Sequence, residues 1–251
     1  MILTRIFPPG DAPVDLEAVD SQDTLHELYR PPRAEWVRLN LIGSVSGSAG
    51  GTDGTSETLS NPLDRRILKI IRDHGDVVLV GAASVRVEGY YLPRSAALAV
   101  VTSSGDMSAH RITTTGQRGP LLILCPASAV DRVRSTLGEA SARIIEVPDT
   151  AGHLAPADII DALRDAGFHS VVVEGGPSLA GQLIDAGLVD ELCLSTSPKL
   201  GGTAIPLFGT QEMAERQLTL TQILADEFSG LYARWAVTNA AEPAGHPASG
   251  Q

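Results

Sequence analysis

The clearest chemical signal in this sequence is a glycine-rich turn that follows a run of three valines. The turn reads Glu174-Gly175-Gly176-Pro177-Ser178. Glycine lets the backbone approach a ligand, and proline favours the first position of a helix, where unpaired N–H groups attract phosphate. The pattern therefore predicts an anion site at the start of a helix, or else a tight strand-to-helix turn that binds nothing.

Hydroxyl-rich and arginine-containing segments accompany this turn. Residues 43–56 form a long loop of glycine, serine and threonine after an apolar strand. Binding sites concentrate in such loops of α/β proteins, although an idle surface loop has the same composition. Arg72 lies near the end of a predicted helix, and Arg94 ends the segment 80–94. Two guanidinium groups can grip one phosphate, so the arginines are candidates for a phosphate clamp, while each alone is more typical of a surface.

Motifs for other kinds of catalysis are missing from the sequence. It contains no GxSxG, GxGxxG or GxxxxGK[ST] pattern, and its six histidines lack the spacing of metal ligands. We therefore predict no metal site, and no catalytic residue is identified. Redox chemistry carried by a bound cofactor is the economical explanation for binding signals without a nucleophile.

Composition restricts the partners and the compartment. The net charge of −11 disfavours a nucleic-acid partner, because phosphodiester backbones are repelled by an acidic surface. No apolar run reaches the roughly 18 residues of a membrane span, and the N-terminus lacks a signal-peptide pattern, so we expect no membrane partner and a cytoplasmic location. Cys125 and Cys193 lie in apolar runs and are expected to be buried and reduced.

Strands and helices alternate between an N-terminal arm (residues 1–34) and a tail predicted to be disordered (residues 239–251). In the arm we expect one short helix near residues 23–29. We expect one domain over residues 35–238, of α/β class, with a mixed, mostly parallel central sheet, helices on both faces and a C-terminal antiparallel hairpin. The predicted strands cover residues 36–44, 76–80, 98–101, 121–124, 142–147, 170–173, 191–197, 218–225 and 231–237. The predicted helices start at Pro62 behind an Asn61 cap and also cover residues 126–137, 156–166 and 177–186.

Taken in order, these segments resemble the reductase domain of riboflavin biosynthesis, the RibD C-terminal type, which has a dihydrofolate-reductase-like fold. The resemblance rests on residues 39–47, 55–56, 68–81, 84–94, 100–103, 174–183 and 189–208, and is strongest to stand-alone actinobacterial members. It implies NADPH-dependent hydride transfer to ribose C1′ of a phosphorylated aminopyrimidine, 5-amino-6-(5-phosphoribosylamino)uracil, giving the ribitylamino compound. It also implies a homodimer.

The same resemblance implies site residues. The implied NADPH-binding residues are Gly43, Thr58, Ser84, Glu88, Ser103, Gly176, Pro177, Ser178, Leu179, Ala180, Gly181 and Gln182. The implied substrate-binding residues are Ser56, Arg72 and Arg94 for the phosphate end, Leu92 beside it, and Glu174 for the pyrimidine.

The sequence departs from the family pattern at two positions. Ser46 stands where the family usually has aspartate, and Glu88 replaces another usual aspartate. Because Ser46 cannot supply a carboxylate, two alternatives stay open: reduction of a pterin such as dihydrofolate, and NADPH binding without catalysis. NADPH rather than NADH is implied by the family alone, with Thr102-Ser103-Ser104 as a candidate location for the 2′-phosphate.

Overall fold

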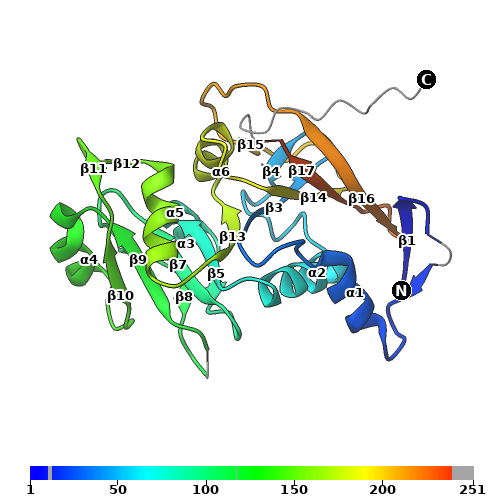
Figure 1. Cartoon of the computed structure of the whole chain (residues 1–251), viewed down its shortest axis with the longest axis horizontal. Helices are drawn as coiled ribbons and strands as arrows, with labels where there is room; N and C mark the ends of the chain where they lie inside the picture. Colours follow the sequence, from blue (N-terminus) through cyan, green and yellow to red (C-terminus); the bar gives the residue numbers. More distant parts are fainter. Residues whose placement is uncertain (11–12, 117, 239–251) are drawn as a thin grey trace, which may run out of the picture.

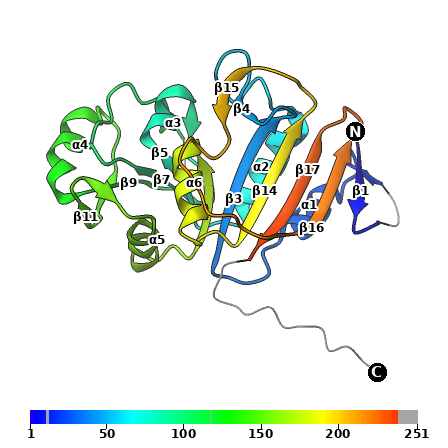
Figure 2. The ribbon, with the colours of Figure 1, turned by 90° about the horizontal axis from the view of Figure 1, so that it is seen from above.

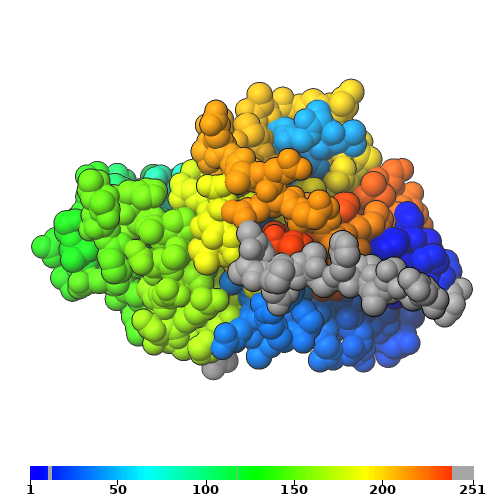
Figure 3. All heavy atoms as spheres, turned by 45° about the horizontal axis from the view of Figure 1, so that its top comes forward, coloured from blue at the N-terminus to red at the C-terminus, as the bar shows by residue number. Residues whose placement is uncertain are grey.

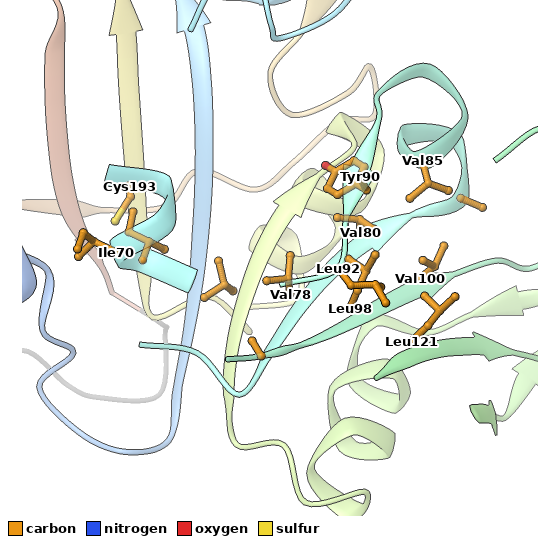
Figure 4. Close-up of a cluster of buried hydrophobic side chains, with 14 of the residues drawn as sticks. Ile70, Val78, Val80, Val85, Tyr90, Leu92, Leu98, Val100, Leu121 and Cys193 are labelled. Atoms are coloured by element: carbon orange, nitrogen blue, oxygen red, sulfur yellow. The ribbon is translucent and has the colours of Figure 1, made fainter. Parts of the chain in front are cut away.

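Alternating apolar side chains let one sheet pack helices on both of its faces. In strand β5 (Val77–Gly81), Val78 and Val80 belong to one hydrophobic cluster, whereas Val77 and Leu79 belong to another on the opposite face. Figure 4 shows part of the first cluster. The computed structural model describes residues 1–10, 13–116 and 118–238; the predicted tail lies outside the described residues.

One eleven-stranded sheet organises the chain (Figure 1). Seven neighbouring strands are parallel, in the order β10 (Arg143–Glu146), β9 (Leu121–Cys125), β7 (Ala97–Val101), β5, β13 (Ser170–Gly175), β3 (Trp36–Ser44) and β14 (Glu191–Ser197). The order continues with four antiparallel strands, β17 (Leu231–Val237), β16 (Leu218–Asp226), β1 (Ile2–Phe7) and β2 (Val14–Asp15). The predicted mixed sheet and C-terminal hairpin are therefore confirmed.

Helices cover the two faces unequally. The helices whose side chains join the first cluster are α1 (Ser21–Tyr29), α2 (Pro62–Asp73), α3 (Ala82–Val87) and α4 (Val130–Thr136), and those joining the second are α5 (Pro156–Asp165) and α6 (Pro177–Asp185). Figure 2 shows the sheet from above, between these helices. Helix α2 begins as predicted, because the Asn61 side chain accepts a bond from the Asp64 N–H and Pro62 follows the cap. Each fully buried leucine or isoleucine of α2 contributes about 1.5–3 kcal/mol.

The structure differs from the prediction in three details. The expected helix over residues 126–137 is a 3-10 turn (Ala127–Ala129) followed by α4, because Ala129 N–H bonds the Pro126 carbonyl three residues back. The segment after β5, for which no helix was predicted, forms helix α3. The arm contains two strands besides its helix, and β1 pairs with β16 through the fully buried Leu3.

The remaining strands form short pairs at the rim of the sheet: β4 (Ser48–Gly50) with β15 (Thr203–Pro206), β6 (Tyr90–Tyr91) with β8 (Ile112–Thr113), and β11 (Asp149–Thr150) with β12 (His153–Leu154). In the space-filling view the blue N-terminal arm lies beside the orange and red C-terminal strands, at the far end from the green segment that includes α4 (Figure 3). Cys125 and Cys193 are buried and free, as predicted. Among the described helices, none is long and apolar enough to cross a membrane.

Candidate active-site cleft

A large cleft opens where parallel strands of the sheet end. On one side of β5 the sheet continues through β7, β9 and β10. On the other side lies β13, after which the chain passes over β3 to form β14, so the order of strands reverses between β5 and β13. Ligands of open α/β sheets bind at the carboxyl ends of strands, at such a reversal of strand order. The cleft here measures about 1290 Å³, and its lining includes Gly81 at the end of β5 and Gly175 at the end of β13.

The predicted glycine turn forms one wall of this cleft. Gly176 is the N-cap of α6 and, lacking a side chain, caps nothing, while Pro177 at the first position has no N–H to offer. A β-carbon on Gly176 would come 2.9 Å from the Ser84 hydroxyl oxygen, so glycine brings the turn close to α3. The nine-residue helix α6 therefore begins at the edge of the cleft, and the N–H groups of Ser178 and Leu179 lie in its first turn.

Most of the residues implied for cofactor binding line the cleft, but four do not. Those in the lining are Ser84, Glu88, Ser103, Gly176, Pro177, Ser178, Leu179 and Gln182. Gly43, Thr58, Ala180 and Gly181 are absent from it. Thr58 bonds Asp53 instead, at 3.0 Å. Gly181 faces away, since a β-carbon there would lie 2.2 Å from the Phe208 carbonyl oxygen.

The implied substrate residues all line the cleft, yet two of them bond each other. Arg72 Nε and Nη2 donate to the two oxygens of Glu174, each at 2.6 Å. Burial acts to lower the pKa of the Arg72 guanidinium, but the Glu174 carboxylate reverses this and raises the pKa above its usual value. The pair neutralises itself, and a phosphate would have to compete with Glu174 for these two N–H groups.

Ser56 and Glu88 are also joined. Glu88 accepts bonds from the Ser56 N–H at 3.0 Å and from the Ser56 hydroxyl at 2.7 Å. These bonds fasten the hydroxyl-rich loop to the end of α3 and place both side chains in the lining. Leu92 and Arg94 also line the cleft, where Leu92 is buried and Arg94 is exposed.

Ser46, at the position of the missing aspartate, does not belong to the lining. Its hydroxyl lies 2.9 Å from the Ser44 hydroxyl and accepts a bond from the Gly201 N–H at 3.0 Å. The side chain therefore connects two loops beside the cleft.

Asp64 is a cleft residue that the sequence reasoning missed. It sits in the first turn of α2, where an acidic residue is ordinary helix-capping composition, so its position alone gave no signal. Burial raises the pKa of its carboxyl, while bonds from Ser195 and Ser60 act in the other direction. Ser60 donates at 2.7 Å, and within the described ranges no arginine or lysine forms an ion pair with this carboxyl. Among the same residues, no group of three or more His, Cys, Asp and Glu could hold a metal ion.

Comparisons with known proteins agree with this architecture. The family model "RibD C-terminal domain" matches residues 35–228. The riboflavin biosynthesis protein RibD of Escherichia coli (strain K12) is 28% identical over 187 residues, covering 67% of this chain and 49% of that protein. RibD of Bacillus amyloliquefaciens is 26% identical over 201 residues, covering 75% of this chain and 54% of that protein.

The chain thus spans about half the length of these curated relatives. A crystal structure of a pyrimidine reductase-like protein from Corynebacterium diphtheriae superposes with a TM-score of 0.69 at 19% identity, covering 85% of this chain and 98% of that one, and confirms the fold. The match to the family model covers well over half of the sequence, and the chain belongs to the RibD C-terminal domain family.

Proposed function

We propose that this chain is an NADPH-dependent reductase that converts 5-amino-6-(5-phosphoribosylamino)uracil into 5-amino-6-(5-phosphoribitylamino)uracil. One observation carries the proposal: strand β13 leads from Glu174, paired with Arg72, directly into the Gly176 cap of α6. A cofactor phosphate on α6 and a substrate at Glu174 would then be neighbours in one cleft. Membership of the family supports the same reaction.

The residues present fit a nicotinamide dinucleotide. A cleft of about 1290 Å³ exceeds the usual 300–1000 Å³ of a single-ligand pocket, so it has room for a cofactor and a substrate together. Ser178 and Leu179 would hold phosphate through their N–H groups, with Ser84 and Ser103 further along the cofactor. When bound, NADPH supplies a hydride. The protein's part is to hold ribose C1′ against it and to exclude water.

Gly176→Ala tests the cofactor site. The added methyl group would meet the Ser84 hydroxyl at 2.9 Å, so the Ser84 side chain must rotate or the turn must move away from α3. We expect the NADPH dissociation constant to rise about tenfold, equivalent to about 1.4 kcal/mol. Fluorescence titration with NADPH and NADH measures it, with thermal unfolding as the control for folding. Equal NADPH affinity in the variant and the wild type would contradict a phosphate site at this turn.

Steady-state oxidation of NADPH with the aminouracil substrate tests the reaction. Turnover by the purified chain is expected. NADPH binding without any turnover on an aminouracil or a pterin would instead favour a binding module.

Asp64 favours a second candidate, reduction of a pterin. A 2-amino-4-oxopyrimidine ring presents two adjacent N–H donors, which match the two oxygens of one carboxylate. The aminouracil offers a comparable pair of donors only at its N1–H and the neighbouring ribosylamino N–H, because its N3–H lies between two carbonyl oxygens that a carboxylate would repel. Asp64→Asn should therefore abolish a pterin activity, and an aminouracil activity that survives the substitution would place that substrate's pyrimidine away from Asp64. Comparing kcat/KM for dihydrofolate and the aminouracil in wild type and variant decides between the two.

We further propose that residues 35–238 form the reductase domain, and that the chain acts in the cytoplasm as a homodimer, as the family resemblance implies. Light scattering of the purified chain tests the assembly: a mass of twice 26.3 kDa is expected, and a single-chain mass would contradict it.

A further inference from the structure

The basic side chains around the cleft differ in whether an acidic partner already neutralises them. Arg65 pairs with Glu57 at 2.7 Å, and Lys69 pairs with Asp73 at 3.2 Å. Arg72 pairs with Glu174, as described above. In contrast, Arg86, Arg94 and Arg118 line the cleft, and within residues 1–10, 13–116 and 118–238 none of the three forms an ion pair. The cleft therefore keeps these cations available although the chain has a net charge of −11.

Arg118 is held in position by groups that leave its charge intact. Its Nη1 donates to the Leu92 carbonyl at 3.1 Å and its Nε to the Thr115 carbonyl at 3.3 Å. The guanidinium carbon lies 5.9 Å from the centroid of the Tyr91 ring. Carbonyl and ring contacts orient a cation without neutralising it, and a pre-ordered side chain loses less entropy when it binds a ligand.

The segments that carry Arg94 and Arg118 are locked together. The Gly119 N–H bonds the Pro93 carbonyl at 2.9 Å, and a β-carbon on Gly119 would come 1.9 Å from the Ala96 carbonyl oxygen. The backbone next to Arg118 is therefore packed against the backbone next to Arg94. Asp73, an acidic residue of the same cleft lining, already accepts bonds from Lys69 and from the Ser95 hydroxyl at 3.0 Å.

We propose that Arg118 is a specificity-determining residue that, with Arg94, binds the phosphate end of the substrate. The inference rests on the proposed function and deepens it. Because Arg72 already donates two N–H groups to Glu174, a phosphate dianion needs further positive charge, and Arg94 and Arg118 can supply it. Two guanidinium groups give the forked donors that phosphate oxygens accept.

Calorimetric titration of the full chain with ribose 5-phosphate, and with ribose as the phosphate-free probe, tests the site. The variants are Arg118→Ala, Arg118→Lys and, as a matched control, Arg143→Ala, which removes an exposed arginine of β10 outside the cleft. Arg118→Ala should weaken ribose 5-phosphate binding about tenfold to a hundredfold, as expected for lost bonds to a charged group. Arg118→Lys should lie between the alanine variant and the wild type, because lysine keeps the charge but not the fork.

The lysine variant also reports on the proposal if the alanine variant folds poorly. Equal ribose 5-phosphate affinity in Arg118→Ala and Arg143→Ala would overturn the inference, as would a wild type that binds ribose 5-phosphate no better than ribose. Normal phosphate binding without NADPH oxidation would instead contradict the proposed reaction and leave this subsite standing.

Discussion

Two arginine–glutamate clusters lie at opposite ends of the parallel strands of the sheet, and their surroundings give them different roles. Glu174 stands near the end of β13 and bonds Arg72 in the cleft, where 23% of the Arg72 side chain is exposed. Glu191 begins β14 and bonds Arg38 at 2.5 Å and Arg234 at 2.6 Å, with the Arg38 side chain only 3% exposed. Parallel strands explain the contrast, since binding sites form at carboxyl ends.

The N-terminal arm packs against the cluster around Glu191. Arg234 Nη1 donates to the Leu28 carbonyl at the end of α1, and its guanidinium lies 5.5 Å from the Tyr29 ring centroid. Burial alone would raise the pKa of Glu191, but Arg38 and Arg234 together hold it below the usual value. The arm therefore completes a structural ion cluster, whereas the Arg72–Glu174 pair remains open to a ligand.

Glu191→Ala should give the largest effect. It leaves two arginines buried without a carboxylate, which costs about 3–5 kcal/mol of unfolding free energy. Urea denaturation at neutral pH measures this, with Glu139→Ala on an exposed loop as the control. In the wild type the contribution of Glu191 is present above the unfolded-state pKa and is lost as the pH falls through the lowered folded-state pKa. A variant as stable as the control would refute a structural role.

Glu174→Gln should lower activity strongly and stability only slightly, the opposite of what is expected for Glu191→Ala. The amide keeps the shape but removes the charge that orients Arg72, so kcat/KM should fall about a hundredfold, or about 2.7 kcal/mol. The unfolding free energy should fall by only about 1 kcal/mol, because the pair is partly exposed to solvent. A loss of stability as large as that of Glu191→Ala, with activity intact, would show that both clusters are structural.

Asp64→Asn should produce the smallest change, and one of opposite sign. A carboxyl whose folded-state pKa is raised by burial destabilises the protein as the pH rises from the unfolded-state value through the folded-state value. The variant should therefore gain stability over the wild type as the pH rises, on the order of 1 kcal/mol at neutral pH. Urea denaturation across a pH series measures the difference. A difference that does not vary with pH would contradict burial of this carboxyl's charge.

The sequence predicted the central elements well, because their signals are local. Strand β3 and strand β14 have the predicted bounds, and α2 starts at the predicted Asn61 cap. Strand β1 was missed because its pairing partner β16 lies more than two hundred residues away. Helix α3 was missed because Ala82, Ala83 and Ser84 resemble a turn until packing buries Val85.

The site was predicted only in part, and for the same reason. The glycine turn at Gly176 carries its own signal, and the family resemblance brought Arg72 and Glu174 together as site residues. That they bond each other depends on a contact between residues 102 apart in sequence. No sequence pattern pointed to Arg118, because its proposed role depends on the absence of an acidic partner, which only the folded structure reveals.

Transfer of deuterium tests the proposed reaction most directly. The purified chain would be incubated with NADPH deuterated at both C4 positions and with the phosphoribosylaminouracil, and the product analysed by mass spectrometry. The predicted result is a ribitylamino product that carries one deuterium at C1′. Product without deuterium, or no product despite bound NADPH, would contradict hydride transfer in this cleft.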